Sequence, residues 1–199
     1  MNHLIGQGFS QHLARACCWA VAVSVLPPLQ HLVRASVPGQ VWATDFQFDS
    51  DWKGRVFKVC NVIDEFTRQH LALRVERRMG AVDVIEMLDL AVLTHGAPQV
   101  LRADNGLEFI AAGVGRWDSE HDTLQAFIPP GQPWHNGFVE SLHNRMRDEL
   151  LEDNMFEDLD HARALIGAWS RRYNEEYPHS ALGWLSPNQY ARQWAQRHQ

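Results

Sequence analysis

Three acidic residues in this chain stand in settings that suit a shared metal site. Asp45 lies in a β-prone run, Asp104 ends an apolar run directly before a turn signal, and Glu140 lies where a helical pattern begins. Two aspartates on strands and a glutamate on a helix can hold two Mg²⁺ ions, about 3.5–4 Å apart, around a phosphodiester. Magnesium prefers oxygen ligands, and Mn²⁺ substitutes for it at such sites. The expected chemistry is therefore phosphodiester cleavage or transfer.

The elements that must position these carboxylates can be read from hydrophobic periodicity and turn signals. Strands are expected where β-branched and aromatic residues dominate, and helices where apolar residues recur every three or four positions. A polar turn at residues 51–54 joins the first two strands into a hairpin. The expected strands are 41–49, 55–63, 70–75, 100–103 and 124–128, and the expected helices are 81–94, 108–117, one from about 137 onward, and 159–177.

The helix that carries Glu140 has two faces. Asn136 is its expected N-cap. An apolar stripe at i, i+4 spacing should face the core, and it consists of Phe138, Leu142, Met146 and Leu150. A second face is centred about 130° from that stripe, and it consists of Glu140, His143, Asn144 and Arg147. Glu140 and Arg147 should therefore point out of the core on the same side of the helix.

The residues around the three carboxylates resemble the DDE transposases of the insertion-sequence-three family and, more distantly, the retroviral integrases. The similarity spans about Val37 to Arg192, and the 35 residues between Asp104 and Glu140 match the spacing of that family. Four ordered blocks carry it: Trp42-Ala43-Thr44-Asp45-Phe46; Asp104-Asn105-Gly106 with Glu108-Phe109; Gly131-Gln132-Pro133, Asn136-Gly137 and Glu140-Ser141 with Arg145 to Leu150; and Tyr173-Asn174, Pro178-His179, Leu182-Gly183 and Leu185-Ser186-Pro187.

The resemblance implies an α/β fold: a ribonuclease-H-like mixed five-stranded sheet flanked by helices, with a helical C-terminal extension. It divides the chain into a catalytic core at 37–155 and the extension at 156–199. Residues 1–36 match no part of the family pattern, and they contain few basic residues where the family carries a basic helix-turn-helix. They are either a short helical lead-in or a poorly ordered, non-native start from a truncated or frameshifted reading frame, and the second interpretation is favoured.

The resemblance also implies residue roles. Asp45 would bridge two Mg²⁺ ions, while Asp104 and Glu140 each complete one. Arg147 matches a position at which the family keeps a cation, and its role would be to hold a DNA phosphate; the alternative is a solvated charge paired with nearby acids. Further DNA contacts are expected from His143, Asn144, Asn105 and Trp134. Trp134 could stack on a splayed base, although loop packing explains it equally well.

Asp64 is a tempting fourth carboxylate, because it follows the second expected strand. The segment Asp64-Glu65-Phe66-Thr67-Arg68 is typical of a strand-end turn, however, and the matching family residue is not part of the triad. A structural role is therefore expected for Asp64.

Composition and charge indicate the cellular compartment of the chain and the partners it can bind. Its 199 residues are 45% hydrophobic, and its net charge of −6 is unusual for a protein that binds DNA phosphates. The 3 cysteines form no disulfide or zinc pattern, and the apolar run 16–26 is too short to span a membrane. A cytoplasmic protein without a membrane partner is expected.

The expected function is a transposase core that cleaves and joins DNA strands. Its partners would be transposon ends and target DNA, bound by a homo-oligomer, with DNA recognition supplied by a helix-turn-helix region or a separate polypeptide. Two alternatives remain open. One is a ribonuclease-H-like nuclease, which hydrolyses but never joins strands. The other is a decayed, non-catalytic transposase remnant, which the acidic charge and the atypical residues 1–36 favour.

Overall fold

The structure of the protein is a computed structural model that describes residues 33–198, except 105, 107–108, 110–111 and 129–135. The chain enters the fold through an antiparallel hairpin of β1 (Val41–Ser50) and β2 (Val56–Asp64), which β3 (His70–Glu76) extends. The predicted polar turn closes the hairpin: Gly54 donates its N–H to the Asp51 carbonyl and has a φ of 72°, a conformation that glycine adopts readily. The three N-terminal strands therefore lie where the sequence predicted them.

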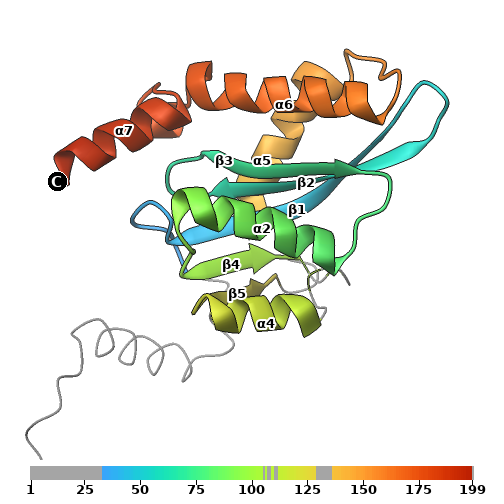
Figure 1. Cartoon of the computed structure of the whole chain (residues 1–199). Helices are drawn as coiled ribbons and strands as arrows, with labels where there is room; N and C mark the ends of the chain where they lie inside the picture. Colours follow the sequence, from blue (N-terminus) through green and yellow to red (C-terminus); the bar gives the residue numbers. More distant parts are fainter. Residues whose placement is uncertain (1–32, 105, 107–108, 110–111, 129–135, 199) are drawn as a thin grey trace, which may run out of the picture.

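Two short parallel strands complete the sheet. β4 (Val100–Ala103) pairs with β1, and β5 (Leu124–Phe127) pairs with β4, so the sheet order is β3-β2-β1-β4-β5. The predicted mixed five-stranded, ribonuclease-H-like sheet is confirmed (Figure 1).

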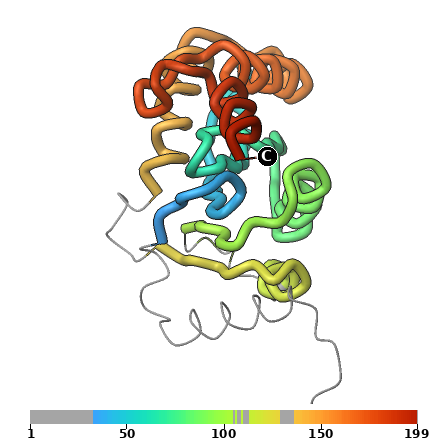
Figure 2. The backbone as a smooth tube through the Cα atoms, turned by 90° about the vertical axis from the view of Figure 1, so that its left-hand side faces the viewer, coloured from blue at the N-terminus to red at the C-terminus, as the bar shows by residue number. Residues whose placement is uncertain are grey.

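Helices cover both faces of the sheet, which gives three layers (Figure 2). The helical elements are α2 (Ala81–His95), α4 (Ala112–Glu120), α5 (Gly137–Met146), the π-helical turn η3 (Arg147–Leu151), α6 (Leu159–Glu176), the 3₁₀ turn η4 (Ser180–Leu182) and α7 (Pro187–Arg197). α2 and α4 lie on one face, while α5 and α6 cover the other. α4 ends at Glu120 rather than at the predicted Trp117, and position 108, its predicted start, lies outside the described residues.

A separate core fills each interface between sheet and helices. The core under α2 and α4 is built around Trp42 and Leu88, and the core under α5 and α6 around Phe57 and Ile166, all of them fully buried. β1, β2 and β3 contribute to both cores because successive side chains point to opposite faces of a sheet. The cores therefore fix the direction of every side chain along β1 and β2.

α5 differs in detail from the predicted helix. Its buried stripe is Val139, Leu142, Met146 and Leu150, and Phe138 lies only half-buried, with the Arg68 guanidinium 3.8 Å from its ring centroid. Phe138 packs against the edge of the core, as a partly buried side chain, while the helix presents its neighbour Val139 fully to the sheet. Asn136 occupies the N-cap position, but its side chain makes no capping hydrogen bond.

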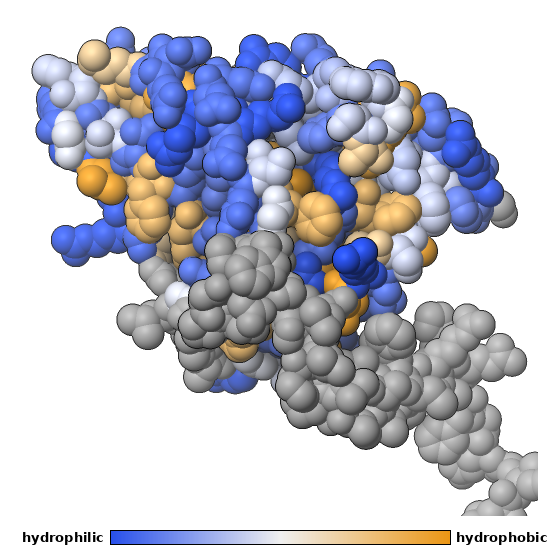
Figure 3. Space-filling model, turned by 180° about the vertical axis from the view of Figure 1, so that it is seen from behind, coloured by the Kyte–Doolittle hydropathy of each residue, from blue (hydrophilic) through white to orange (hydrophobic). Residues whose placement is uncertain are grey.

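The surface on the α5 side is mixed. Seen from behind, it is largely hydrophilic in the upper part of the molecule and carries apolar patches lower down (Figure 3). No helix in the described part of the chain combines the length and apolar character needed to cross a bilayer.

Candidate active site

Asp45 lies in the middle of β1 and faces α5. Strand alternation sends Trp42 and Phe46 toward the α2 core, while Ala43, Asp45 and Gln47 face the opposite layer. β4 pairs with β1 only from Val41 to Ala43. Asp45 therefore lies just beyond the last residue pair between the parallel strands β1 and β4, and its side chain is partly exposed there.

Burial and nearby negative charge raise the pKa of the Asp45 carboxyl to about 6. The larger cause is burial, and the carboxylates of Asp104 and Glu140 raise the pKa further, while a hydrogen bond from the Phe46 backbone N–H to Oδ1, at 2.7 Å, opposes the rise. Asp45 is therefore close enough to both other carboxylates for their negative charge to act on its own carboxyl.

The other two carboxylates approach Asp45 from different elements. Asp104 directly follows β4 and is exposed, and its Oδ1 accepts a hydrogen bond from the Gly106 N–H at 2.9 Å. Glu140 lies in the first turn of α5. In the part of the chain that the structure describes, no three Asp, Glu, His or Cys side chains are grouped tightly enough to hold a metal ion.

The donor set nevertheless fits magnesium. Three carboxylates from three separate elements supply the oxygen ligands that Mg²⁺ prefers. Burial is the main cause of the raised pKa of Asp45, and the negative charge of Asp104 and Glu140 adds to it; a divalent cation would neutralise that charge.

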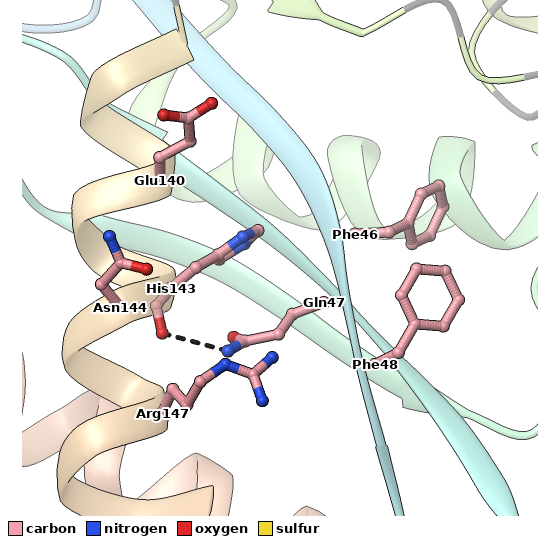
Figure 4. Close-up of a pocket in the computed structure, with 7 residues that line it drawn as sticks. All are labelled: Phe46, Gln47, Phe48, Glu140, His143, Asn144 and Arg147. Atoms are coloured by element: carbon pink, nitrogen blue, oxygen red, sulfur yellow. Dashed lines mark hydrogen bonds between the residues drawn. The ribbon is translucent and has the colours of Figure 1, made fainter. Parts of the chain in front are cut away.

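A pocket of about 320 Å³ extends from Glu140 along α5. Figure 4 shows Glu140, His143, Asn144 and Arg147 on α5 and the turn that follows it, with Gln47 reaching toward them from β1 and Phe46 and Phe48 on the far side of the strand. The four residues of the predicted second face thus line one pocket.

Arg147 lies at the far end of this pocket from Glu140 (Figure 4). It is exposed, and its guanidinium forms no ion pair with any residue that the structure describes. It is also the first residue of the π-helical turn, and π-helical turns often occur at functional sites. Its role in holding a DNA phosphate, which the sequence left open alongside a solvated ion pair, remains a prediction.

His143 is buried against the sheet, with 12% of its side chain exposed. Its Nδ1 lies 4.0 Å from Asp45 Oδ2, and its Nε2 lies 3.0 Å from Nδ2 of Asn61. Burial, together with the positive charge of Arg147, lowers the pKa of His143 to about 4, so the ring is neutral at pH 7. Its side chain is directed at Asp45, and its contact with DNA remains a prediction.

Three further residues were predicted to contact DNA. Asn144 is exposed and lines the pocket, whereas Asn105 and Trp134 lie outside the described residues. The contacts of all three with DNA remain predictions.

Asp64 has the environment of a structural carboxylate. It is buried and accepts hydrogen bonds from the backbone N–H groups of Gly39, Phe66 and Thr67. These bonds close the turn between β2 and β3 and tie down the chain before β1. The expected structural role of Asp64 agrees with this geometry.

Sequence reasoning missed three residues around the site. Gln47 donates its Nε2 hydrogen to the His143 carbonyl at 3.0 Å, Asn61 contacts His143, and Phe48 lines the pocket. Asn61 gave a signal, because it is the one uncharged polar residue in the apolar strand Val56–Asp64. In the predicted hairpin it lies directly opposite Asp45.

Two overlapping segments of the chain match family descriptions, and both are of an integrase core domain. One match covers residues 35–133 and contains Asp45 and Asp104. The other covers residues 121–187 and contains Glu140 and Arg147. Together they cover the sheet, α5 and α6.

Similar proteins occur in bacterial insertion elements. The uncharacterized 39.2 kDa protein of IS476 from Xanthomonas euvesicatoria is 36% identical over 162 residues, which is 81% of this chain and 47% of that protein. An uncharacterized protein of IS407 from Burkholderia multivorans is 35% identical over the same share of the chain and 58% of its own length. The transposase of IS629 from Shigella sonnei is 23% identical over 77% of the chain and 52% of its own length. The chain thus spans about half the length of these relatives.

Solved structures share the fold. The catalytic core domain of HTLV-2 integrase, solved in complex with magnesium, superposes with a TM-score of 0.63 at 16% identity, over 79% of this chain and 99% of that one.

Proposed function

The chain belongs to the integrase core domain family of insertion-element transposases, and from this premise we propose that it cleaves and joins DNA strands during transposition. The observation that carries the proposal is the environment of Asp45. Its carboxyl lies close enough to Asp104 and Glu140 for both to raise its pKa, although the three residues come from β1, the end of β4 and α5. Carboxylates that repel one another are retained together at a site where a cation is to bind.

We propose that Asp45, Asp104 and Glu140 would together hold two Mg²⁺ ions, with Mn²⁺ as a substitute. When bound, the ions would lower the pKa of a water or of a DNA 3′-OH and stabilise the leaving oxygen. The chain's own residues orient the substrate around them. Arg147 would hold a phosphate of the DNA strand that reacts at the carboxylates, because its guanidinium borders the pocket that begins at Glu140. Asn144, exposed in this pocket, would contact the sugar-phosphate backbone beside it.

The DNA-bound assembly is also part of the proposal. Two transposon ends and one target must meet, so we propose that the protein acts as an oligomer on DNA. The described chain has a net charge of −6, and it spans only about half the length of its relatives. Recognition of the DNA ends is therefore assigned to a further region or to a separate polypeptide.

A strand-joining assay tests the proposal and separates it from its alternatives. Labelled duplexes with a free 3′-OH are incubated with the protein and Mg²⁺ or Mn²⁺, and longer, joined products are expected. Cleavage without joining would identify a nuclease, and a folded protein that yields neither product would be a decayed remnant. Asp45→Asn, Asp104→Asn and Glu140→Gln should each abolish the products. Asp49→Asn, on the same strand, should not.

A further inference from the structure

Three contacts between the sheet and α5 meet at His143. The Gln47 side chain binds its carbonyl from β1, the Asn61 amide contacts its Nε2 from β2, and its Nδ1 lies 4.0 Å from Asp45 Oδ2. Gln47, Asn61 and Asp45 point toward α5 because all three lie on the same face of the sheet. His143 therefore links the helix of the third carboxylate to the strand of the first, one turn after Glu140.

The Asn61 amide determines which ring nitrogen of His143 carries the proton. Asn61 is fully buried and lies opposite Asp45 in the strand register. Its Nδ2 is a donor, so Nε2 of His143, 3.0 Å away, must accept, and a neutral ring then carries its hydrogen on Nδ1. Nδ1 is also the ring atom that lies 4.0 Å from Asp45 Oδ2. The reversed amide would leave a lone pair on Nδ1 facing a carboxylate, which is a repulsive arrangement.

We propose that Asn61 and His143 form a positioning pair for Asp45. One carboxylate oxygen, Oδ1, accepts the Phe46 backbone N–H at 2.7 Å, and the other, Oδ2, faces the His143 N–H. At 4.0 Å this second contact is longer than a hydrogen bond, so it acts through the attraction between the N–H dipole and the carboxylate. The hydrogen bond at Oδ1 and this attraction at Oδ2 together orient a carboxylate that, under the proposed function on which this inference rests, would be a metal ligand.

The pair also links Asp45 to the helix that carries Glu140. A change in the rotamer of His143 would remove both its attraction to Asp45 Oδ2 and its contact with Asn61, while the Gln47 bond to the backbone would persist. Partners of this kind, which orient a metal ligand without touching the metal, change metal affinity by about 10–100-fold when they are removed.

Nitrogen NMR of the metal-free protein tests the pair directly. Long-range ¹H–¹⁵N spectra distinguish the protonated ring nitrogen from the bare one, and the His143 signals are identified by their loss in His143→Gln. We expect a fixed tautomer with the proton on Nδ1, and we expect Asn61→Ala to convert it into a mixture of tautomers. A proton on Nε2 in the unaltered protein, or a tautomer that Asn61→Ala leaves unchanged, would overturn the proposal.

Metal affinity tests the consequence. In calorimetric titrations with Mn²⁺, Asn61→Ala and His143→Ala should each weaken binding by roughly 10-fold. The double variant should bind no more weakly than the weaker single variant, because the two residues act as a unit. His143→Asn, which keeps an N–H donor, should recover part of the affinity. Variants that melt at lower temperature but bind Mn²⁺ like the unaltered protein would show that the pair is merely structural.

Asn154→Ala is the matched control. The Asn154 side chain donates to the Leu150 carbonyl at 2.7 Å, away from the carboxylates, so its loss should lower stability without changing Mn²⁺ affinity. The two proposals fail separately. If the unaltered protein shows no Mn²⁺ binding that depends on Asp45, the proposed function fails. The tautomer measurement, made without metal, still decides whether Asn61 orients His143 toward Asp45.

Discussion

The side chain of Gln47 donates a hydrogen bond from Nε2 to the backbone carbonyl of His143, at 3.0 Å. This bond joins the strand that carries Asp45 to the helix that carries Glu140, and Gln47 is almost completely buried. The elements that carry the negatively charged Asp45 and Glu140 are therefore joined by a buried hydrogen bond between uncharged groups. The fold holds the carboxylates near one another against their repulsion, and several measurable consequences follow.

The first prediction concerns stability without metal. Asp45 has a folded-state pKa of about 6 against an ordinary value of 3.8, so between these values the native state binds the proton more tightly than the unfolded chain does. Its contribution to stability therefore falls as pH rises through this window. At pH 7 the charged carboxylate costs on the order of 1–3 kcal/mol. In EDTA, Asp45→Asn should raise the melting temperature at pH 7 by several degrees, and the gain should disappear near pH 4. A lower melting temperature at pH 7 would contradict this reasoning.

The second prediction concerns stability with metal. A cation that binds the native state but not the unfolded chain stabilises the fold by about 2.7 kcal/mol at 100 times its Kd. Millimolar Mg²⁺ or Mn²⁺ should therefore raise the melting temperature, and Asp45→Asn should abolish the rise. Asp49→Asn, on the same strand, is the control and should leave the rise intact. An equal rise in Asp45→Asn would mean that the cations bind elsewhere.

The third prediction concerns Arg147. If its guanidinium holds a DNA phosphate beside the carboxylates, Arg147→Gln should reduce strand joining by roughly 10-fold or more and reduce the salt dependence of DNA binding by about one ion. The fold should melt as before, because Arg147 is exposed and makes no ion pair within the described residues. Arg116→Gln removes an exposed arginine from α4, on the opposite face of the sheet, and should change neither quantity.

The fourth prediction concerns Asp64. Asp64→Ala removes the acceptor for three backbone N–H groups around a buried turn, so it should lower the free energy of unfolding by about 2–4 kcal/mol. Mn²⁺ affinity, measured well below the melting temperature, should not change. A loss of affinity with intact folding would instead make Asp64 a fourth metal ligand.

The fifth prediction concerns DNA affinity. The chain's net charge of −6 provides few phosphate contacts, so it should bind duplexes in the non-specific range, about 10⁻⁴–10⁻⁶ M at physiological salt. Titration of labelled duplexes at two salt concentrations measures both the affinity and the slope, which should be shallow. Sub-micromolar binding that distinguishes one duplex sequence from another would instead show that this chain contains a recognition element.

The sequence predicted most of the sheet because its strands are strongly patterned. The hairpin of β1 and β2 and the strand β4 were found almost to the residue, since apolar alternation and turn residues agree there. The faces of α5 were less certain. Phe138 satisfies the helical period and packs at the edge of the core, but Val139 takes the fully buried place, because the packing of the helix on the sheet decides how deeply each side chain is buried.

For the candidate site too, some features follow from the sequence and others only from the packing. The sequence by itself determined the identity of Asp45, Asp104 and Glu140, because residue type, order and spacing persist along a chain whatever its packing. Only the tertiary structure decided that the charges of Asp104 and Glu140 raise the pKa of Asp45. It also decided that Arg147 makes no ion pair with an acidic residue in the described part of the chain, and that Asn61 and Gln47 both contact His143. These relationships depend on burial and on distances between elements far apart in the sequence. Such quantities are set when the sheet and α5 pack together, and no local pattern encodes them.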